Sequence, residues 1–189
     1  MPALPSRVVG DAYTSSYHWD LLSDLVDIDD RMAGGTGEAA AAERLGEAFE
    51  SLGLDGVGID EFGIPGWWRG GSSLTVEFGR TRTFDADYRI IGLPGTPAGE
   101  PEGELVDVGY GRPADFEAAD LEGRIAMASS MTPDDHGRWI HRTEKYHFAA
   151  NAGAAGFVFR NHVEGCLPPT GSVGGKEGPG PIPAVGVSK

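Results

Sequence analysis

The stretch "EKYHFAANAGAAGFVFRN", residues 144–161, joins two kinds of secondary structure in one short run. Its first part, up to Gly156, has the composition of a short helix that ends in glycines, and "GFVFRN" has that of a strand. The small residues of "AANAGAAG" allow a helix and the following strand to approach closely. The stretch therefore predicts a helix that packs tightly beside an apolar strand.

Further strands are predicted on both sides of this stretch. "GRIAMAS" is uniformly apolar from Ile125 to Ala128, as expected of a strand covered on both faces, and "IPAVGVS" is the last strand. "ELVDVGYG" is another strand, and a Gly-Arg turn between "SLTVEF" and "TRTFDADYRI" predicts a hairpin. "GVGIDEFGI", residues 56–64, is also a predicted strand, whereas residues 163–181 form a long Gly/Pro loop.

Two helices are predicted ahead of these strands, after a loose lead-in over residues 1–14. "SYHWDLLSDLVDIDDRM" has apolar residues at roughly helical spacing. "TGEAAAAERLGEAFESLGL" begins with Thr36 as its N-cap and ends at Gly53, which supplies the left-handed residue after a helix. The apolar residues of this second helix form one continuous stripe: Ala41, Ala42, Leu45, Ala48, Phe49 and Leu52.

The net charge of the chain excludes some classes of binding partner. The 189 residues carry a formal net charge of −14, which argues against binding to nucleic acids or to anionic membrane surfaces. Only Lys145, Lys176 and Lys189 are lysines, and the other cations are arginines. Because dense carboxylates hold water and ions, and salt screens their repulsion, this composition predicts a protein from a salt-adapted organism; an ordinary acidic protein is the alternative.

The cellular compartment is predicted from three sequence features: disulfides, a signal peptide and membrane spans. Cys166 stands alone, so no internal disulfide forms. The first residues have no apolar core of signal-peptide length, and no segment approaches the roughly 20 apolar residues of a membrane span. A cytoplasmic location is therefore expected.

Catalytic motifs are weak. HExxH, GxSxG and GxxxxGK[ST] do not occur. His136, His141 and His147 lie close together in the sequence, next to Asp134 and Asp135, so a metal site is one interpretation. Yet a spacing of six residues puts two side chains about 600° apart around a helix, on opposite faces. No catalytic or metal-binding residue is therefore assigned, and surface positions with ordinary hydrogen bonds are expected for these histidines.

Aromatic residues are the candidates for contact with a substrate or partner. Trp67 and Trp68 precede an arginine and two glycines, and Trp139 lies beside Arg138 and Arg142. Tryptophan is enriched in recognition sites, and a positive aromatic spot suits a carboxylate. The candidate contact residues are Trp67, Trp68, Arg138 and Trp139. The alternative is that each tryptophan is a core residue or a partly exposed cap.

The N-terminal helices resemble the beginning of the M28-family zinc aminopeptidases. In that family a helix is followed by an R-x-x-G break and by an alanine-rich helix ending in Leu-Gly and an apolar residue. The matching residues here are Arg31 and Gly34, and then Leu52, Gly53 and Leu54.

The second part is similar to the protease-associated (PA) domain that is often inserted in those enzymes. The resemblance rests on an L-x-G-[RK]-[IV] segment, an A-x-x-A-G-A-x-G helix end and a closing strand. These segments are Leu121 with Gly123, Arg124 and Ile125; residues 149–158; and Ile182, Pro183, Ala184, Val185, Gly186, Val187 and Ser188.

The resemblance implies an α+β fold with a PA-type β-sandwich or open barrel, flanked by short helices and preceded by a helical pair. Residues 1–55 would be the helical segment, part of a missing peptidase domain, and residues 56–189 the PA domain. The chain would stop before a catalytic domain that holds two zinc ions, so it would bind no cofactor and be inactive alone. It would act in cis with that domain as a wall or lid that shapes the access of peptide substrates.

Two other functions stay open. One is an autonomous peptide- or protein-binding module. The other is an enzyme that uses the histidines and aspartates of residues 134–147. The stripe from Ala41 to Leu52 should pack partly against the missing domain. Left bare, it would form an apolar patch that favours a homodimer or folds back on the β domain.

Overall fold

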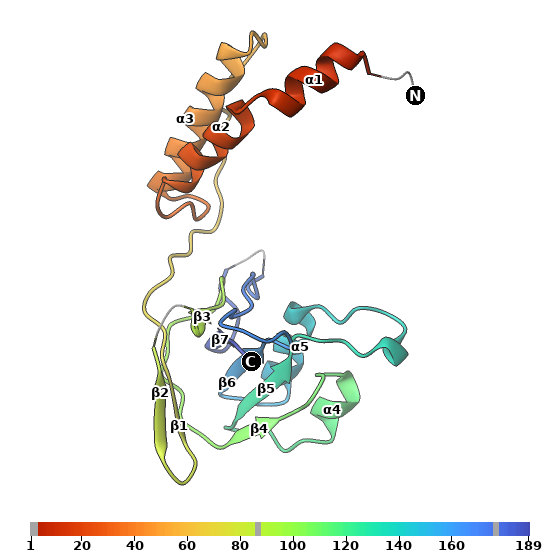
Figure 1. Cartoon of the computed structure of the whole chain (residues 1–189). Coiled ribbons are helices and arrows are strands. Elements are labelled where there is room, and N and C mark those ends of the chain that lie inside the picture. Colours follow the sequence, from red (N-terminus) through yellow and green to blue (C-terminus); the bar gives the residue numbers. More distant parts are fainter. Residues whose placement is uncertain (1–3, 86–87, 176–177) are drawn as a thin grey trace. The chain divides into compact units, whose positions relative to one another are not determined.

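The computed structural model describes residues 4–85, 88–175 and 178–189, and the chain forms two compact units, Met1–Gly66 and Trp67–Lys189 (Figure 1). The first unit is helical, and all strands of the described residues lie in the second. This arrangement confirms the α+β fold class. The division into a peptidase segment, residues 1–55, and a PA domain, residues 56–189, stays a prediction. Among the described helices, none has the length and apolar character needed to cross a membrane.

The described residues of the first unit form three helices: α1 (Ser6–Thr14), α2 (Tyr17–Val26) and α3 (Thr36–Ser51). The prediction of a loose lead-in over residues 1–14 is wrong, because α1 occupies most of it. The predicted N-cap is also displaced by one residue: Gly35 caps α3, and Thr36 is its first helical residue. In place of a capping hydroxyl, the carboxylate of Glu38 accepts a hydrogen bond from the Gly34 N–H at 2.6 Å.

The end of α3 follows the sequence prediction. Gly53 has a positive φ of 74°, which glycine adopts without steric penalty. The Gly53 N–H donates to the Glu50 carbonyl at 2.9 Å, and the Leu54 N–H donates to the Phe49 carbonyl at 3.2 Å. These two bonds define a Schellman motif, which satisfies carbonyls that the helix end leaves without partners.

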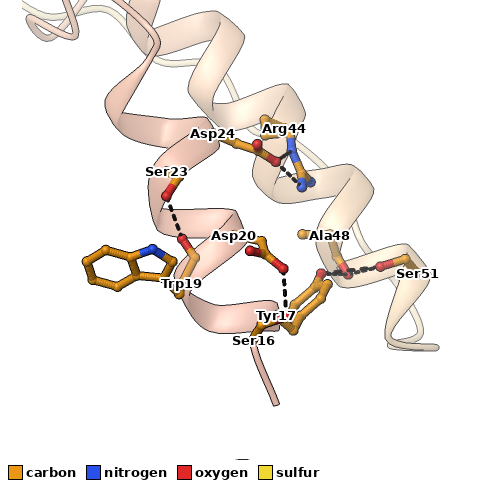
Figure 2. A network of polar contacts seen from close by, with 9 residues as sticks. All are labelled: Ser16, Tyr17, Trp19, Asp20, Ser23, Asp24, Arg44, Ala48 and Ser51. Carbon is orange, nitrogen blue, oxygen red and sulfur yellow. Dashed lines mark hydrogen bonds and ion pairs between the residues drawn. The ribbon is translucent and has the colours of Figure 1, made fainter.

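Polar contacts join α2 to α3 (Figure 2). Arg44 donates from Nε and Nη2 to one carboxylate oxygen of Asp24, at 3.0 and 2.6 Å. The Tyr17 hydroxyl lies 3.3 Å from the Ala48 carbonyl oxygen. The side chain of Trp19 points away from α3 in Figure 2 and is exposed. The indole of Trp19 is therefore not part of the contact between these helices, whereas Leu21 and Leu25 of α2 are half-buried.

The second unit is built on a five-stranded sheet in the order β3–β7–β6–β5–β4. The four strands from β4 to β7 are parallel, and β3 pairs antiparallel with β7. A separate antiparallel hairpin pairs β1 with β2. The strands span Leu74–Glu77 (β1), Thr81–Phe84 (β2), Ile90–Gly92 (β3), Leu105–Asp107 (β4), Ile125–Ser129 (β5), Gly156–Arg160 (β6) and Ala184–Val187 (β7).

Two helices and a 3-10 turn connect the parallel strands: α4 (Pro113–Glu117), η1 (Asp134–His136) and α5 (Arg142–Asn151). Helix α5 packs against β6 and contacts α4. The core lies around β5, α5 and β6, which are the elements that the sequence predicted most directly. Its buried hydrophobic side chains include Phe116, Leu121, Ala126, Ala128, Tyr146, Ala149, Phe157 and Phe159.

Two strand predictions fail. Residues 56–64 contain no strand, and their Ile59 and Phe62 side chains are exposed. A strand needs a neighbouring strand to satisfy its backbone groups, and this segment pairs with none. The predicted second arm of the hairpin ends at Phe84, because Ile90 belongs to β3 in the other sheet. Residues 86–87, which fall inside that predicted arm, lie outside the described residues.

Candidate functional site

Polar side chains gather at the carboxyl edge of the parallel sheet, where β5 and β6 end. Ser129 pairs with Arg160 as the last residues of their strands, and the Ser130 N–H donates to the Arg160 carbonyl at 2.7 Å. The connection from β5 to α5 leaves this same edge, so the start of α5 lies there too. Ligands of parallel α/β sheets commonly bind at this edge. The carboxyl edge is therefore the natural place to look for a site.

Lys145 is the most unusual residue at this edge, because its side chain is fully buried. Its Nζ donates to the carbonyl oxygens of Ser129 and Met131, both at 2.8 Å. Burial lowers the pKa of the amine to about 8, and the negative charge of Asp115 partly opposes this shift. No sequence pattern singled out Lys145 as a functional residue. The feature that could have identified it is the rarity of lysine. This chain strongly prefers arginine, yet it places a lysine inside the predicted helix that begins the stretch 144–161.

A serine–histidine pair lies beside it. The Ser130 hydroxyl is 2.7 Å from Nδ1 of His162 and accepts a hydrogen bond from the His162 backbone N–H at 3.0 Å. Ser130 is 8% exposed, so its hydroxyl is enclosed, whereas His162 is exposed. The pair links the ends of β5 and β6. Sequence reasoning missed it because the two residues are brought together only by the strand register.

The three histidines of the predicted metal alternative occupy different local structures. His136 ends η1, and His141 is the N-cap of α5, where its side chain accepts from the Thr143 N–H. His147 lies in α5 with its ring edge-on to that of Tyr146. Across residues 4–85, 88–175 and 178–189, no group of three or more His, Cys, Asp or Glu side chains is placed to hold a metal ion. These residues therefore do not fit the zinc pair of the resembling family.

Arg138 and Trp139 lie in the connection that follows β5. Arg138 forms a two-pronged ion pair with Glu144, with nitrogen–oxygen distances of 3.0 and 2.7 Å. This pair, together with the hydrogen bond from the His141 N–H, lowers the pKa of the Glu144 carboxyl to about 2. Trp139 is 59% exposed. Arg138 is thus held by the carboxylate of Glu144 in the same chain, and the indole of Trp139 beside it is exposed to solvent.

Trp67 and Trp68 lie elsewhere. Trp67 is partly buried, and its indole N–H donates to the Thr96 carbonyl at 2.8 Å. The Thr96 hydroxyl in turn accepts from the Ala184 N–H at the start of β7, which belongs to the amino edge of the parallel strands. Trp68 is 65% exposed. The structure therefore brings Arg138 and Trp139 together at one edge and anchors Trp67 at the other. Contact of all four residues with a substrate or partner stays a prediction.

Comparison with known proteins relates this geometry to peptidases. Residues 101–189 match the PA domain family. No curated protein matches the chain. Among solved structures, the zinc aminopeptidase BSAP from Bacillus subtilis is 27% identical, with a TM-score of 0.65, over 92% of this chain and 39% of that one.

A second structure supports the same fold. The M28 peptidase precursor from Shewanella amazonensis is 23% identical, with a TM-score of 0.70, over 97% of this chain and 43% of that one. The chain therefore spans about two fifths of the length of these structures. Residues 101–189 thus match the PA domain family, and the chain shares its fold with part of the zinc aminopeptidase BSAP and of the M28 peptidase precursor.

Proposed function

We propose that this chain is the non-catalytic part of a zinc-dependent M28 exopeptidase and that it shapes the access of peptide substrates to the active site. The observation that carries the proposal is the match to the Bacillus subtilis zinc aminopeptidase. That match extends over 92% of this chain, which leaves room for most of the helical unit, but over only 39% of the enzyme. The chain therefore corresponds to one part of such an enzyme, with the zinc chemistry assigned to the other part.

Shape and rigidity support a role in substrate access. Clefts form at the boundaries between domains, and a fixed wall beside a cleft limits which substrates can adopt a reactive orientation. Trp139 is an exposed aromatic residue whose neighbours are held by the Arg138–Glu144 pair. Such a residue can contact a peptide with little loss of conformational entropy, because its surroundings are already ordered.

Activation of a water molecule by zinc is the chemistry that the remainder of the enzyme would supply. The described residues offer no ligand set for it, so no catalytic step is assigned to this chain. The role of this chain in catalysis would be to exclude unsuitable peptides from the cleft and to orient those that bind. The partner implied is a catalytic domain in cis, and the ligands are peptides.

A chimera tests the role in access. The segment of the Bacillus subtilis aminopeptidase that matches residues 67–189 would be replaced by those residues, and kcat/KM measured for an aminoacyl anilide and for peptides of increasing length. We expect zinc content and turnover of the anilide to be kept, and the preference between short and long peptides to change. A chimera with full zinc and an unchanged length preference would contradict the proposal.

The alternative function is an autonomous peptide- or protein-binding module, and the exposure of Trp68 and Trp139 favours it. It predicts that the chain alone binds peptides, with a shift in tryptophan fluorescence that is lost in Trp139→Ala. Under the access role, affinity for peptides in the absence of a catalytic domain should be negligible. A saturable peptide affinity of the isolated chain would therefore favour the alternative.

The helical unit provides the surface for the proposed partner domain. Phe49 and Leu52, at the end of the predicted stripe, are exposed, and so are Trp19, Leu22 and Val26 on α2. Ala48 is buried and Leu21, Leu25 and Leu45 are half-buried, so only the exposed side chains are available for another surface. We assign that surface to the catalytic domain, and in its absence to a second copy of this chain.

The acidic surface and the location complete the proposal. The net charge of −14 and the preference for arginine support an origin in a salt-adapted organism. A cytoplasmic location is proposed on the sequence features alone.

A further inference from the structure

The environment of Lys145 is built to hold its side chain. The residue lies in the first half of α5, and its aliphatic stem passes Gly111, where a Cβ atom would lie 3.0 Å from Cδ of the lysine. The ring of Phe159 faces Nζ at 5.9 Å from its centroid. Gly111 has a positive φ of 67°, so both its conformation and the space beside it favour glycine.

The two acceptors of Lys145 lie at the stem of one loop. Ser129 is the last residue of β5, and Met131 opens the connection to α5. We name residues 130–141 the Trp139 loop. It is closed at its base by Thr132, whose hydroxyl accepts a hydrogen bond from the Ile140 N–H at 3.1 Å. Ile140 is buried, whereas Trp139 beside it is 59% exposed. The amine therefore fastens the stem of a loop that presents an aromatic side chain.

We propose that Lys145 is a positioning residue for the Trp139 loop and that opening of the loop is coupled to uptake of a proton by its amine. This inference does not depend on the exopeptidase role, because it concerns a contact within the chain. It follows from two facts of geometry: the amine is fully buried, and its two hydrogen-bond acceptors are neutral carbonyls.

Few charged groups lie near Lys145, and several of them form hydrogen bonds or ion pairs with other residues. Asp115 of α4 is the carboxylate whose charge acts on the amine, and it also accepts a hydrogen bond from the Arg112 N–H. Several other titratable groups nearby have partners among the described residues: Arg112 with Asp135, Glu144 with Arg138, His141 with Thr143, and His162 with Ser130. Arg160, at the end of β6, has a buried Nε without a hydrogen-bond partner among the described residues. No buried carboxylate is paired directly with the amine within the described part of the chain.

The direction of the coupling follows from burial. A neutral amine has two hydrogens, enough for both carbonyls, so deprotonation keeps both hydrogen bonds and removes the burden of a buried charge. In the closed loop the pKa is about 8, whereas an amine exposed by opening would return to 10.5. Opening therefore takes up a proton between these two values. Raising the pH through this window favours the closed loop, by roughly tenfold per unit and on the order of a hundredfold in all.

Hydrogen exchange of the full chain tests the coupling. Exchange of residues 130–141 would be followed by mass spectrometry from about pH 7 to pH 10 and divided by the intrinsic rate at each pH. We expect protection of the Trp139 loop to rise with pH above 8 by about tenfold per unit. In Lys145→Met the protection should be lower and independent of pH, because the donors and the titrating group are both gone.

Lys189→Met is the matched control, because Lys189 forms an exposed pair with Glu164 and is remote from this loop in the sequence. It should keep the wild-type profile. A wild-type protection that is flat across the window, or a Lys145→Met profile that still rises with pH, would overturn the proposal.

A second measurement needs no variant, in case Lys145→Met does not fold. The Cε resonance of Lys145 would be titrated by nuclear magnetic resonance together with the amides of Met131 and Thr132. We expect the lysine and these amides to share one midpoint near pH 8. A lysine that titrates at its ordinary value, or loop amides that do not respond with it, would refute the coupling.

Discussion

Glu144 closes the capping box of α5 and also holds Arg138, so one carboxylate fixes both a helix start and the loop before it. Its side chain is 36% exposed, so solvent screening keeps the value of the ion pair small. The capping bond to the His141 N–H adds a separate contribution. The residue thus links local helix geometry to the position of Trp139.

Glu144→Gln should destabilise the protein by about 1 kcal/mol at neutral pH, through loss of the charge-assisted bonds. The carboxyl has a folded pKa of about 2 against an ordinary value of 4.5, so its stabilisation is present above 4.5 and is lost as the pH falls towards 2. The difference in unfolding free energy between wild type and variant should therefore shrink from pH 6 to pH 3 in urea titrations.

Glu164→Gln is the control for this prediction, because Glu164 is an exposed carboxylate paired with Lys189 and caps no helix. Its effect at neutral pH should be close to zero. A Glu144→Gln variant as stable as Glu164→Gln at neutral pH would show that the charge of Glu144 does not stabilise the start of α5.

Strand β7 of the five-stranded sheet is in close contact with the long Gly/Pro loop. At Gly186 in β7, a Cβ atom would collide with the carbonyl oxygen of Pro169, which belongs to the long Gly/Pro loop. The loop therefore lies directly against the strand. Val173, further along the same loop, is fully buried, so the loop contributes to the core although its described residues have almost no regular structure.

Gly186→Ala should destabilise the second unit by about 2 kcal/mol or more, because the added methyl group must displace either the loop or the strand. Gly175→Ala is the matched control: a Cβ atom there meets nothing within 4 Å. It should change stability by less than about 0.5 kcal/mol in the same urea titration. Equal stabilities of the two variants would contradict the packing of the loop on β7.

Sequence patterns located the elements whose signals are local. The apolar run from Ile125, the helix ending in Ala/Gly residues and the end of α3 at Gly53 each depend on neighbours in the sequence, and all are confirmed. The strand predicted at residues 56–64 failed, because strand formation depends on a partner that sequence alternation cannot supply.

The site was less predictable for the same physical reason. Arg138 and Trp139 were selected from their residue types, but the pairing of Arg138 with Glu144 depends on how α5 begins. The burial of Lys145 depends on Gly111 and Phe159, which come from other elements. Contacts of this kind are set by tertiary packing and leave no periodic trace in the sequence.

At the scale of the whole molecule, the helical unit leaves apolar side chains exposed. We expect the chain to self-associate at tens of micromolar in sedimentation experiments, since contiguous apolar surface promotes association. The double variant Phe49→Gln, Leu52→Gln should shift the distribution towards monomer. Phe78→Gln, which removes a single side chain that is 90% exposed in the hairpin turn, should not. A wild-type monomer at these concentrations would contradict the prediction.

Net charge makes a separate prediction. Because 29 acidic residues face 15 basic ones, mutual repulsion destabilises the compact state at low ionic strength. Thermal unfolding from about 0.1 M to about 2 M KCl should show a rise in Tm of roughly 5 °C or more as the repulsion is screened. A Tm that stays constant or falls would argue for an ordinary acidic protein.

The central claim is that this chain shapes access to a zinc peptidase site without forming one. The most direct test is to measure zinc content and hydrolysis of aminoacyl anilides on the purified chain supplied with zinc. We expect no stoichiometric zinc and hydrolysis no faster than the blank. About one zinc per chain together with turnover would contradict it.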